Sequence, residues 1–180
     1  MPRWSNPPLL VYHGTDTIAV PRAAGLPIGR SVPFRIQVGL CRPFTDFGQG
    51  FYVTTHLHQA RQWANAKVIR TPNPSSQVLV LGFFLDRDWL ASLEALTFVR
   101  PIQDFWNLVY DCRNMFPPHQ RVLPATAAYD TVYGPVTLWP SILTIQDCDQ
   151  ISLHNQTKID DHQLADPIII DKALTDTFPV

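Results

Sequence analysis

Glycines and aromatic residues stand close together in one segment of this chain, Asp46-Phe47-Gly48-Gln49-Gly50-Phe51-Tyr52-Val53-Thr54-Thr55. Trp63 follows Tyr52 by eleven positions, and His13-Gly14 lies upstream at the end of an apolar run. A glycine lets another group come close to the backbone, and an aromatic ring stacks favourably on a flat ring system. These residue types in this spacing predict a slot for a flat heterocycle.

Two strands and a helix must position these residues. Leu9–His13 is typical of a buried strand that leads into Gly14, and Gly50–Thr54 is typical of a strand that carries Tyr52. The spacing of apolar residues predicts a helix from His56 to about Arg70, which would carry Trp63. The residues expected on its buried face are Leu57, Ala60, Ala64 and Val68.

The remaining pattern mixes strands and helices without a regular alternation. Gln77–Leu85 is a continuous apolar run, as expected for a central strand that is buried on both faces. The other expected elements are a long loop at Pro21–Thr45, helices at Asp88–Leu96 and Ile102–Met115, and strands at Tyr129–Val136, Gln150–Leu153 and Ile168–Ile170. We expect Gly134-Pro135 to halt the strand that begins at Tyr129. This mixture favours an α+β fold over a doubly wound sheet.

Composition and charge limit the class of protein. With 180 residues, of which 46% are apolar and 11% aromatic, the chain can bury a sizeable core, so we expect a single domain over residues 1–180. The net charge is −1 and the 14 Lys and Arg are scattered, which leaves no electrostatic footprint for nucleic acid or an anionic membrane. The chain carries no bilayer-spanning run and no secretion signal, and its three cysteines give no disulfide framework. We expect a soluble, cytoplasmic protein.

The spacing of His, Cys and Ser gives little support to metal or nucleophile chemistry. His56 and His58 would lie on different faces of the predicted helix, and no Cys or Glu stands at ligand spacing. The serines lie outside any nucleophile elbow, and Cys112 has no visible partner. We expect no metal, and a hydrolase that uses scattered histidines such as His119 and His162 stays as an alternative.

The segment Phe47-Gly48-Gln49-Gly50-Phe51-Tyr52, followed by Trp63, resembles a known signature. It belongs to the poly(ADP-ribose) polymerase and diphtheria-toxin branch of the ADP-ribosyltransferase superfamily, in which a Gly-x-Gly-x-Tyr strand precedes a helix with a second aromatic residue. His13-Gly14-Thr15 resembles the His-Gly-Ser/Thr of the first strand in the same branch.

An ordered set of motifs resembles more closely the bacterial family DUF3990. That pattern runs from Tyr-His-Gly through Asp-Phe-Gly-x-Gly-Phe-Tyr-x-Thr and Trp-Ala to Tyr-Asp-x-Val-x-Gly-Pro and a final Asn-Gln-Ile. The corresponding pieces here, spread over residues 12 to 154, are Tyr12-His13-Gly14, Asp46–Thr54, Trp63-Ala64, Tyr129–Pro135 and Asp149-Gln150-Ile151. Each motif alone is short, and the shared order makes the set specific.

The resemblance implies a fold, an activity and a setting. The fold would be α+β, with two packed, roughly orthogonal β-sheets that form a split NAD-binding cleft and are flanked by helices. The activity would be transfer of ADP-ribose from NAD to a macromolecular acceptor, a protein rather than a nucleic acid, with release of nicotinamide. The setting would be that of a toxin, effector or anti-phage protein, delivered by a secretion system and paired with a cognate immunity protein or antitoxin.

The resemblance also implies roles for individual residues. Gly14 would bind the nicotinamide amide through its backbone, and His13 would bind the adenosine-side ribose. Tyr52 would stack on the nicotinamide, and Trp63 would either enclose the ring from the other side or pack in the core. Arg42 is a candidate for the pyrophosphate because a guanidinium matches phosphate oxygens. The full cofactor-binding set is His13, Gly14, Thr15, Arg42, Phe51, Tyr52 and Trp63.

The third catalytic position departs from the branch. Polymerases and most toxins carry a Glu there, whereas the sole Glu of this chain, Glu94, is expected at the surface. The motif-matching residue is Gln150, which accepts a hydrogen bond but carries no charge, and Asp149 would point to the opposite face of the strand. The catalytic set is therefore His13, Tyr52 and Gln150, and its neutral third member argues against polymer elongation. We expect Gln150→Glu to retain or raise turnover, and Tyr52→Ala to abolish NAD binding while leaving the fold largely intact.

Two alternatives use the same slot. An NAD glycohydrolase would pass the ribosyl group to water instead of a macromolecule. A non-catalytic module would only bind NAD, ADP-ribose or a partner protein, and the neutral Gln150 favours it. Release of nicotinamide separates the module from the enzymes, and the destination of the ADP-ribose separates the two enzymes.

Overall fold

A computed structural model describes residues 7–70, 73–115, 129–162, 164 and 166–172. The chain forms two compact units, each assembled from separate segments. Unit 1 comprises Met1–Arg35, Thr54–Ser92 and Leu164–Val180, and unit 2 comprises Ile36–Val53 and Leu93–Gln163. The expectation of one domain over residues 1–180 stays a prediction.

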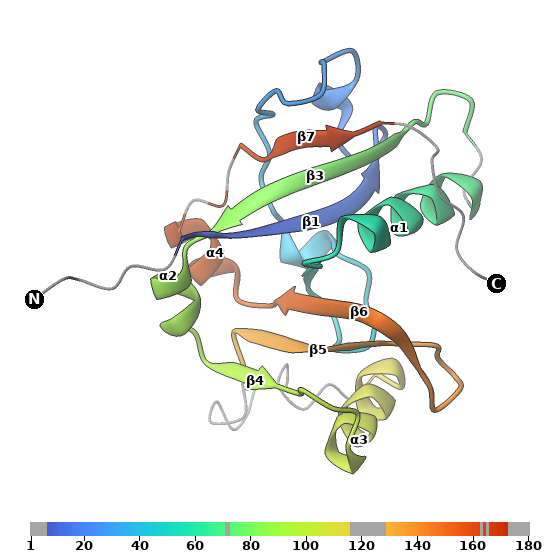
Figure 1. Ribbon diagram of the computed structural model, residues 1–180, viewed down its shortest axis with the longest axis vertical. Coiled ribbons are helices and arrows are strands. Elements are labelled where there is room, and N and C mark those ends of the chain that lie inside the picture. The colour runs from blue at the N-terminus through green and yellow to red at the C-terminus, as the bar shows by residue number, and fades with distance from the viewer. Residues whose placement is uncertain (1–6, 71–72, 116–128, 163, 165, 173–180) are drawn as a thin grey trace, which may run out of the picture. The chain divides into compact units, whose positions relative to one another are not determined.

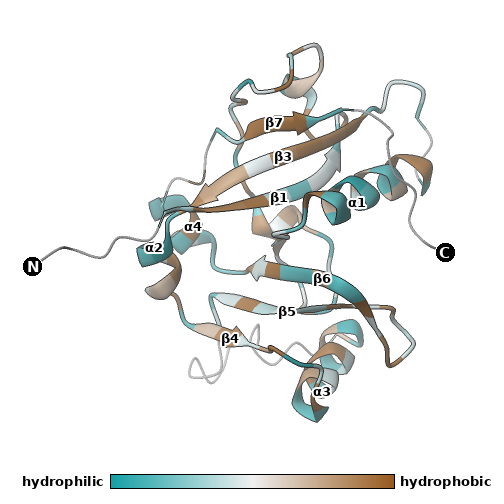
Figure 2. Cartoon of the chain, in the orientation of Figure 1, coloured by the Kyte–Doolittle hydropathy of each residue, from teal (hydrophilic) through white to brown (hydrophobic). Residues whose placement is uncertain are grey.

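Unit 1 contains an antiparallel sheet in the order β1-β3-β7 (Figure 1). The strands are β1 (Leu9–Asp16), β3 (Val78–Leu85) and β7 (Ile168–Asp171). All residues of β3 except Phe84 are buried, which is the consequence of its uninterrupted apolar sequence (Figure 2). The prediction of a central strand buried on both faces is confirmed apart from Phe84.

Helix α1 (Leu57–Arg70) packs against β1 and β3. Ala60 and Ala64 are fully buried against Val78 and Val80, while Leu57 and Val68 are half-buried beside them. The predicted apolar face of this helix is thus confirmed. The segment between β1 and β2 contains two short 3-10 helices, η1 (Pro21–Ala23) in unit 1 and η2 (Val38–Leu40) in unit 2.

Helix α2 (Arg87–Ala91) is shorter than predicted. The Asp86 carboxylate caps it by accepting a hydrogen bond from Trp89 N–H at 2.8 Å. The predicted helix over Asp88–Leu96 is wrong beyond Ser92, because Ala95–Thr97 forms strand β4 and pairs in parallel with β5 (Thr131–Thr137). Three residues are too few to show the alternation that is typical of a strand, so the helical spacing of the surrounding apolar residues dominated the prediction.

Unit 2 contains a sheet in the order β2-β6-β5-β4. Its remaining strands are β2 (Phe51–Val53), β5 (Thr131–Thr137) and β6 (Thr144–Leu153). The prediction that Gly134-Pro135 halts a strand is wrong, since β5 continues to Thr137. A register shift between Pro135 and Thr137 accommodates the proline, which cannot donate a ladder hydrogen bond.

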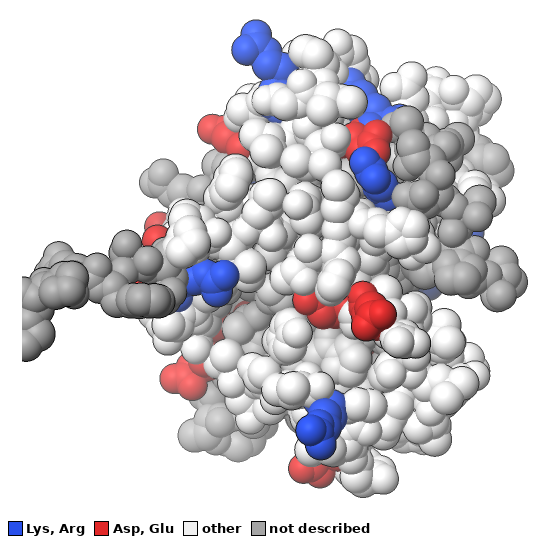
Figure 3. Space-filling view, viewed as in Figure 1, with Lys and Arg blue, Asp and Glu red and all other residues white. Residues whose placement is uncertain are grey.

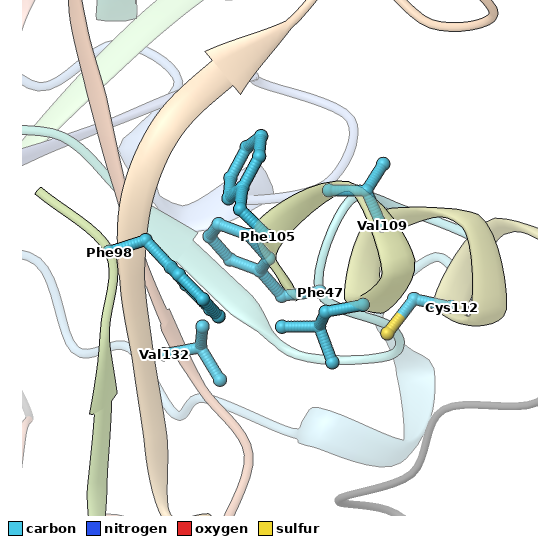
Figure 4. Packing of buried hydrophobic residues seen from close by; sticks show 7 residues of the cluster. Phe47, Phe98, Phe105, Val109, Cys112 and Val132 are labelled. Carbon is cyan, nitrogen blue, oxygen red and sulfur yellow. The ribbon is translucent and has the colours of Figure 1, made fainter. Parts of the chain in front are cut away.

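Helix α3 (Gln103–Arg113) closes the core of unit 2, as its periodicity predicted. Figure 4 shows side chains of α3 and of strand β5 directed toward one another. The buried cluster consists of Phe47, Phe98, Phe105, Leu108, Val109, Cys112 and Val132. Phe105 meets the rings of Phe47 and Phe98 edge-on, with centroids 6.1 and 5.5 Å apart.

Helix α4 (Gln156–His162) has no counterpart among the predicted elements. Its first residue, Gln156, joins it to the start of η2, because its side chain accepts from Val38 N–H at 2.8 Å and donates to the Ile36 carbonyl at 3.0 Å. Such a contact between residues far apart in sequence leaves no local signal.

The α+β class is confirmed. The expectation that the two sheets pack roughly orthogonally around an NAD cleft, as in the ADP-ribosyltransferases, stays a prediction. Among the described residues, no helix has both the length and the apolar character needed to cross a membrane.

Candidate functional site

Gly14 presents its backbone at the open edge of the unit 1 sheet. Its neighbour Tyr12 exchanges two backbone hydrogen bonds with Thr54, at 2.8 and 2.9 Å, so the polar groups of Tyr12 face away from β3. Backbone groups alternate in direction along a strand, so those of Gly14 point to the same edge. One N–H donor beside one C=O acceptor is the complement of a carboxamide group.

The glycine at position 14 is also required by packing. A Cβ atom there would lie 2.1 Å from the Ala60 carbonyl oxygen and 2.9 Å from the Ala64 nitrogen, both in the backbone of α1. Real Cβ contacts are never so short, so only glycine lets the helix cross β1 at this point. The Tyr-His-Gly motif therefore has a structural reason that is independent of any ligand.

His13 and Thr15 flank this glycine in different environments. His13 is half-buried, and strand alternation directs its side chain to the face opposite the one that Gly14 turns toward α1. Thr15 is buried, and its hydroxyl accepts a hydrogen bond from Lys67 Nζ at 3.0 Å, while the same ammonium lies 3.1 Å from Asp16. Thr15 thus has a structural partner at the position where cofactor binding was predicted.

Trp63 lies on α1 and is 41% exposed. The alternative that it packs in the core is wrong, since the core-facing residues of the helix are its neighbours Gln62 and Ala64. An exposed indole offers a flat apolar surface to a ring.

The Tyr52 hydroxyl is held inside unit 2. It accepts hydrogen bonds from Thr45 Oγ1 at 2.8 Å and from Phe47 N–H at 2.9 Å, and it donates to the Gly48 carbonyl at 2.9 Å. Burial raises the pKa of this phenol, although the two donors act in the opposite direction. Gly48 closes the turn with a φ of 79°, which glycine adopts without strain.

One face of the Tyr52 ring is occupied by protein. The ring stacks on Phe47 with centroids 6.3 Å apart and an interplanar angle of 20°. Tyr52 is half-buried, so part of its side chain stays accessible. A ligand could therefore stack only from the side that Phe47 leaves open.

Tyr52 and Gln150 lie on the same face of the unit 2 sheet. Tyr52 pairs with Ser152 across β2 and β6, and Gln150 stands two residues before Ser152 on β6. Side chains alternate between faces with a period of two, which makes Tyr52 and Gln150 diagonal neighbours about 7–8 Å apart. The structure thus brings these two predicted site residues together within one unit.

Gln150 is buried and bound to a carboxylate. Its Nε2 donates to Asp46 Oδ2 at 2.7 Å and to the Pro135 carbonyl at 3.0 Å. Within the described chain its Oε1 accepts no hydrogen bond, and it is not among the buried polar atoms that lack a partner. This oxygen is the atom of Gln150 that stays open to a ligand.

Asp46 joins three elements of unit 2. Its carboxylate, which is buried, accepts hydrogen bonds from Arg113 at the end of α3 and from the N–H and hydroxyl of Thr137 at the end of β5. Arg113 also donates to the Phe44 carbonyl at 3.1 Å. Together with the bond from Gln150 on β6, these donors tie three elements to one carboxylate.

The other predicted residues are scattered over unit 2. Phe51 is buried. Arg42 is exposed, so its guanidinium is accessible to a phosphate group. Asp149 is buried, and Glu94 is exposed as predicted. Asp130 anchors local structure, because its carboxylate accepts from Glu94 N–H at 3.1 Å and from Asn155 Nδ2 at 2.6 Å.

His154, which is half-buried, and the buried Ser152 form a hydrogen-bonded pair at the end of β6. His154 Nδ1 lies 2.9 Å from the Gln49 carbonyl, which can only accept, so Nδ1 carries the proton and Nε2 accepts from Ser152 Oγ at 2.7 Å. Burial lowers the pKa of His154 to about 4, despite the opposing hydrogen bond to Gln49. Ser152 is fully buried, which makes the pair structural.

Residues with metal or thiol chemistry are not assembled into a site in the described chain. No group of three or more His, Cys, Asp or Glu lies within metal-binding reach among residues 7–70, 73–115, 129–162, 164 and 166–172. His119 lies outside those residues. Burial raises the pKa of the Cys112 thiol to about 12, so it stays protonated and is a poor nucleophile at neutral pH.

Residues 31–148 match a protein-family model described as "Protein of unknown function (DUF3990)". The chain belongs to this family. No curated protein and no solved structure is significantly similar to it. Membership of DUF3990 confirms the nearer of the two resemblances, whereas the link to the ADP-ribosyltransferases stays a prediction.

The DUF3990 match covers only part of the candidate set. It includes Arg42, Phe51, Tyr52 and Trp63, and it begins after Gly14 and ends before Gln150. It also includes Asp46, Arg113 and Thr137, to which sequence reasoning gave no role. Asp46 opens the Asp-Phe-Gly-x-Gly motif of the family, and a charged residue in front of an apolar strand was the signal that could have singled it out.

Proposed function

We propose that this protein binds NAD and transfers its ADP-ribosyl group to a macromolecular acceptor as a mono-ADP-ribosyltransferase. The observation that carries the proposal is the backbone of Gly14, because its N–H and C=O at the open edge of β1 can pair with the carboxamide of nicotinamide. The ordered motifs of the chain, which resemble those of ADP-ribosyltransferases, support it further.

Most of the predicted residues have a role in the proposed reaction. The resemblance assigns stacking on the nicotinamide to Tyr52 and Trp63, the adenosine-side ribose to His13, and the diphosphate to the exposed Arg42. Gln150 accepts a hydrogen bond from a hydroxyl of the nicotinamide ribose. The bond between nicotinamide N1 and ribose C1′ breaks, its electron pair leaves with nicotinamide, and an acceptor nucleophile bonds to C1′ and loses its proton.

Stabilisation of the positive charge in the transition state is the step to which these residues contribute least. The transition state of such a cleavage has oxocarbenium character and gains from a nearby negative charge. Gln150 is neutral, and the Asp46 carboxylate beside it is already paired with Arg113. We therefore expect slow transfer of single ADP-ribosyl groups and no polymer.

A second candidate is a module that binds NAD or ADP-ribose, or a partner protein, without catalysis. The observation that favours it is that Tyr52 and Gln150 both have structural hydrogen bonds, as expected of residues that hold the fold together. An NAD glycohydrolase, the third candidate, differs from the transferase only in using water as acceptor. The setting of a toxin or effector with an immunity partner remains part of the proposal.

The experiment that tests the proposed function measures where the nicotinamide and the adenine parts of NAD end up after incubation with the protein. Purified protein is incubated with a cell lysate and with NAD labelled separately in the nicotinamide ring and in the adenine ring. The transferase predicts free labelled nicotinamide and adenine label on a macromolecule. Adenine label found only as free ADP-ribose would identify a glycohydrolase, and intact NAD in both samples would leave the binding module.

Arg42 and Arg100 provide a matched pair of variants for NAD binding. Both are exposed arginines of unit 2, and only Arg42 lies in the candidate set. Arg42→Ala should weaken NAD binding about tenfold, as expected for loss of one charge-assisted contact, and Arg100→Ala should not. Equal affinities of the two variants would remove Arg42 from the site.

A further inference from the structure

The orientation of the Gln150 amide is determined by its surroundings. Nε2 lies 2.7 Å from Asp46 Oδ2 and 3.0 Å from the Pro135 carbonyl oxygen. Both neighbours are acceptors only, so the opposite orientation of the amide would bring three oxygens together. The NH2 group therefore faces Asp46 and Pro135, and Oε1 faces the other way.

The Asp46 carboxylate is itself immobilised. Thr137 N–H donates to Oδ2 at 3.0 Å, and Thr137 Oγ1 and Arg113 Nε donate to Oδ1 at 2.7 and 3.0 Å. Only 3% of Asp46 is exposed, so no water competes for these bonds. Helix α3 and strand β5 thus hold the carboxylate, and the carboxylate holds the amide.

We infer that Asp46 is a positioning residue that turns the carbonyl oxygen of Gln150 toward the ligand, so that the site selects a ligand with a hydroxyl group at this point. A fixed Oε1 offers an acceptor and no donor, and a sugar hydroxyl meets it whereas a carbonyl or phosphate oxygen does not. The inference rests on the proposed function in that the hydroxyl is a ribose hydroxyl of NAD.

The same geometry alters one expectation from the sequence. Gln150→Glu would place a second carboxylate at the position where an NH2 group now meets Asp46 Oδ2 and the Pro135 carbonyl. Two carboxylates at this distance repel each other, and the donor that now holds the side chain in place is lost. We now expect this variant to lose turnover and not to retain or raise it.

The first arm of the test needs no ligand. The side-chain amide of Gln150 is observed by NMR in the ¹⁵N-labelled free protein, and its hydrogen exchange is compared between the wild type and Asp46→Asn. The inference predicts slow exchange in the wild type and at least tenfold faster exchange in the variant. Rapid exchange in the wild type, or unchanged exchange in the variant, would overturn it.

The second arm compares NAD with its analogue that lacks the 2′-hydroxyl of the nicotinamide ribose. The wild type should prefer NAD about tenfold, the size expected for one hydrogen bond, and Asp46→Asn should prefer it no more than about twofold. Thr137→Val is the control, since it removes one bond to Asp46 and leaves Gln150 in place. It should lower the melting temperature and keep the tenfold preference.

The outcomes distinguish the inference from the proposed function. A merely structural Asp46 would lower stability in Asp46→Asn and leave the preference for NAD unchanged. NAD binding by the wild type without preference would reject the inference and leave the proposed function standing. No NAD binding would reject the proposed function and the ribose assignment, and amide exchange would still decide whether Asp46 orients Gln150. If Asp46→Asn fails to fold, two other measurements test the inference. The side-chain amide of Gln150 must exchange slowly in the wild type, and Gln150→Met must lose the preference for NAD over the analogue without the 2′-hydroxyl.

Discussion

Tyr52 illustrates how a residue that was assigned to a ligand can also hold the fold. Its ring rests on Phe47, and its hydroxyl bonds to Thr45, Phe47 and Gly48. Tyr52→Ala would remove all of these contacts together. We therefore expect Tyr52→Ala to destabilise the fold, in contrast to the expectation from the sequence. A smaller change is needed to separate an effect on binding from an effect on folding.

Tyr52→Phe is that smaller change. The ring and its stacking surface remain, while the Phe47 N–H loses its buried acceptor and the Gly48 carbonyl loses one of its two hydroxyl donors. We expect a loss of about 1–3 kcal/mol in the free energy of unfolding and an NAD affinity within about threefold of the wild type. Urea unfolding and calorimetry measure the two quantities. A large loss of affinity with unchanged stability would show that the hydroxyl contacts the ligand and not the Gly48 turn.

His154 predicts how the stability of the protein depends on pH. In the unfolded chain it protonates at its ordinary pKa of 6.5, whereas burial lowers its pKa to about 4 in the folded protein. The unfolded chain binds more protons between these values, so the stability that His154 contributes is complete above pH 6.5 and is lost as the pH falls toward 4. The loss should be on the order of 3 kcal/mol, measured by urea unfolding at a series of pH values.

His154→Asn provides the control for this pH dependence. The Asn side chain can keep a donor near the Gln49 carbonyl and does not titrate. The variant should be less stable at pH 7 and should show a shallower decline between pH 6.5 and 4. An equal decline in both proteins would assign the pH dependence to other groups.

At the scale of elements, the contact between α1 and β1 decides what position 14 tolerates. Gly14→Ala would place a methyl group 2.1 Å from the Ala60 carbonyl, in backbone that cannot move without shifting the helix. We expect a loss of at least about 3 kcal/mol in the free energy of unfolding. Gly39→Ala, whose added methyl meets nothing within 4 Å, should change it by less than about 1 kcal/mol. Similar values for the two variants would contradict the close packing of α1.

The elements that were predicted correctly carry their own pattern. β3 is an apolar run of eight residues and α1 repeats small apolar residues at helical spacing, so burial follows from the local sequence. The errors have tertiary causes. β5 continues through Gly134-Pro135 because Gly134 packs beneath Phe47 and Phe105, and β4 forms because β5 lies beside it.

The candidate site divides in the same way. Tyr52 and Gln150 were recognised from motifs, and pairing of β2 with β6 places them on one face. Asp46 was not given a role because its partners stand far away in sequence, 104 residues for Gln150 and 91 for Thr137. A single chain shows no trace of such contacts, so the orientation of Gln150 could be learned only from the structure.

At the scale of the whole molecule, the charge differs between the two units. Unit 1 contains nine Lys and Arg against six Asp and Glu, and unit 2 contains five against nine, although the complete chain has a net charge of only −1. On the face drawn in Figure 3, the charged groups are few and form no extended patch of one sign. On that face no continuous basic surface is available to a long polyanion such as nucleic acid.

Titration calorimetry of NAD into the purified chain measures whether NAD binds to this protein at all. We expect saturable binding of one NAD per chain, weakened about tenfold in Gln150→Met, which loses the acceptor oxygen. Absence of any binding heat at several temperatures, or identical affinities of the wild type and Gln150→Met, would contradict this expectation.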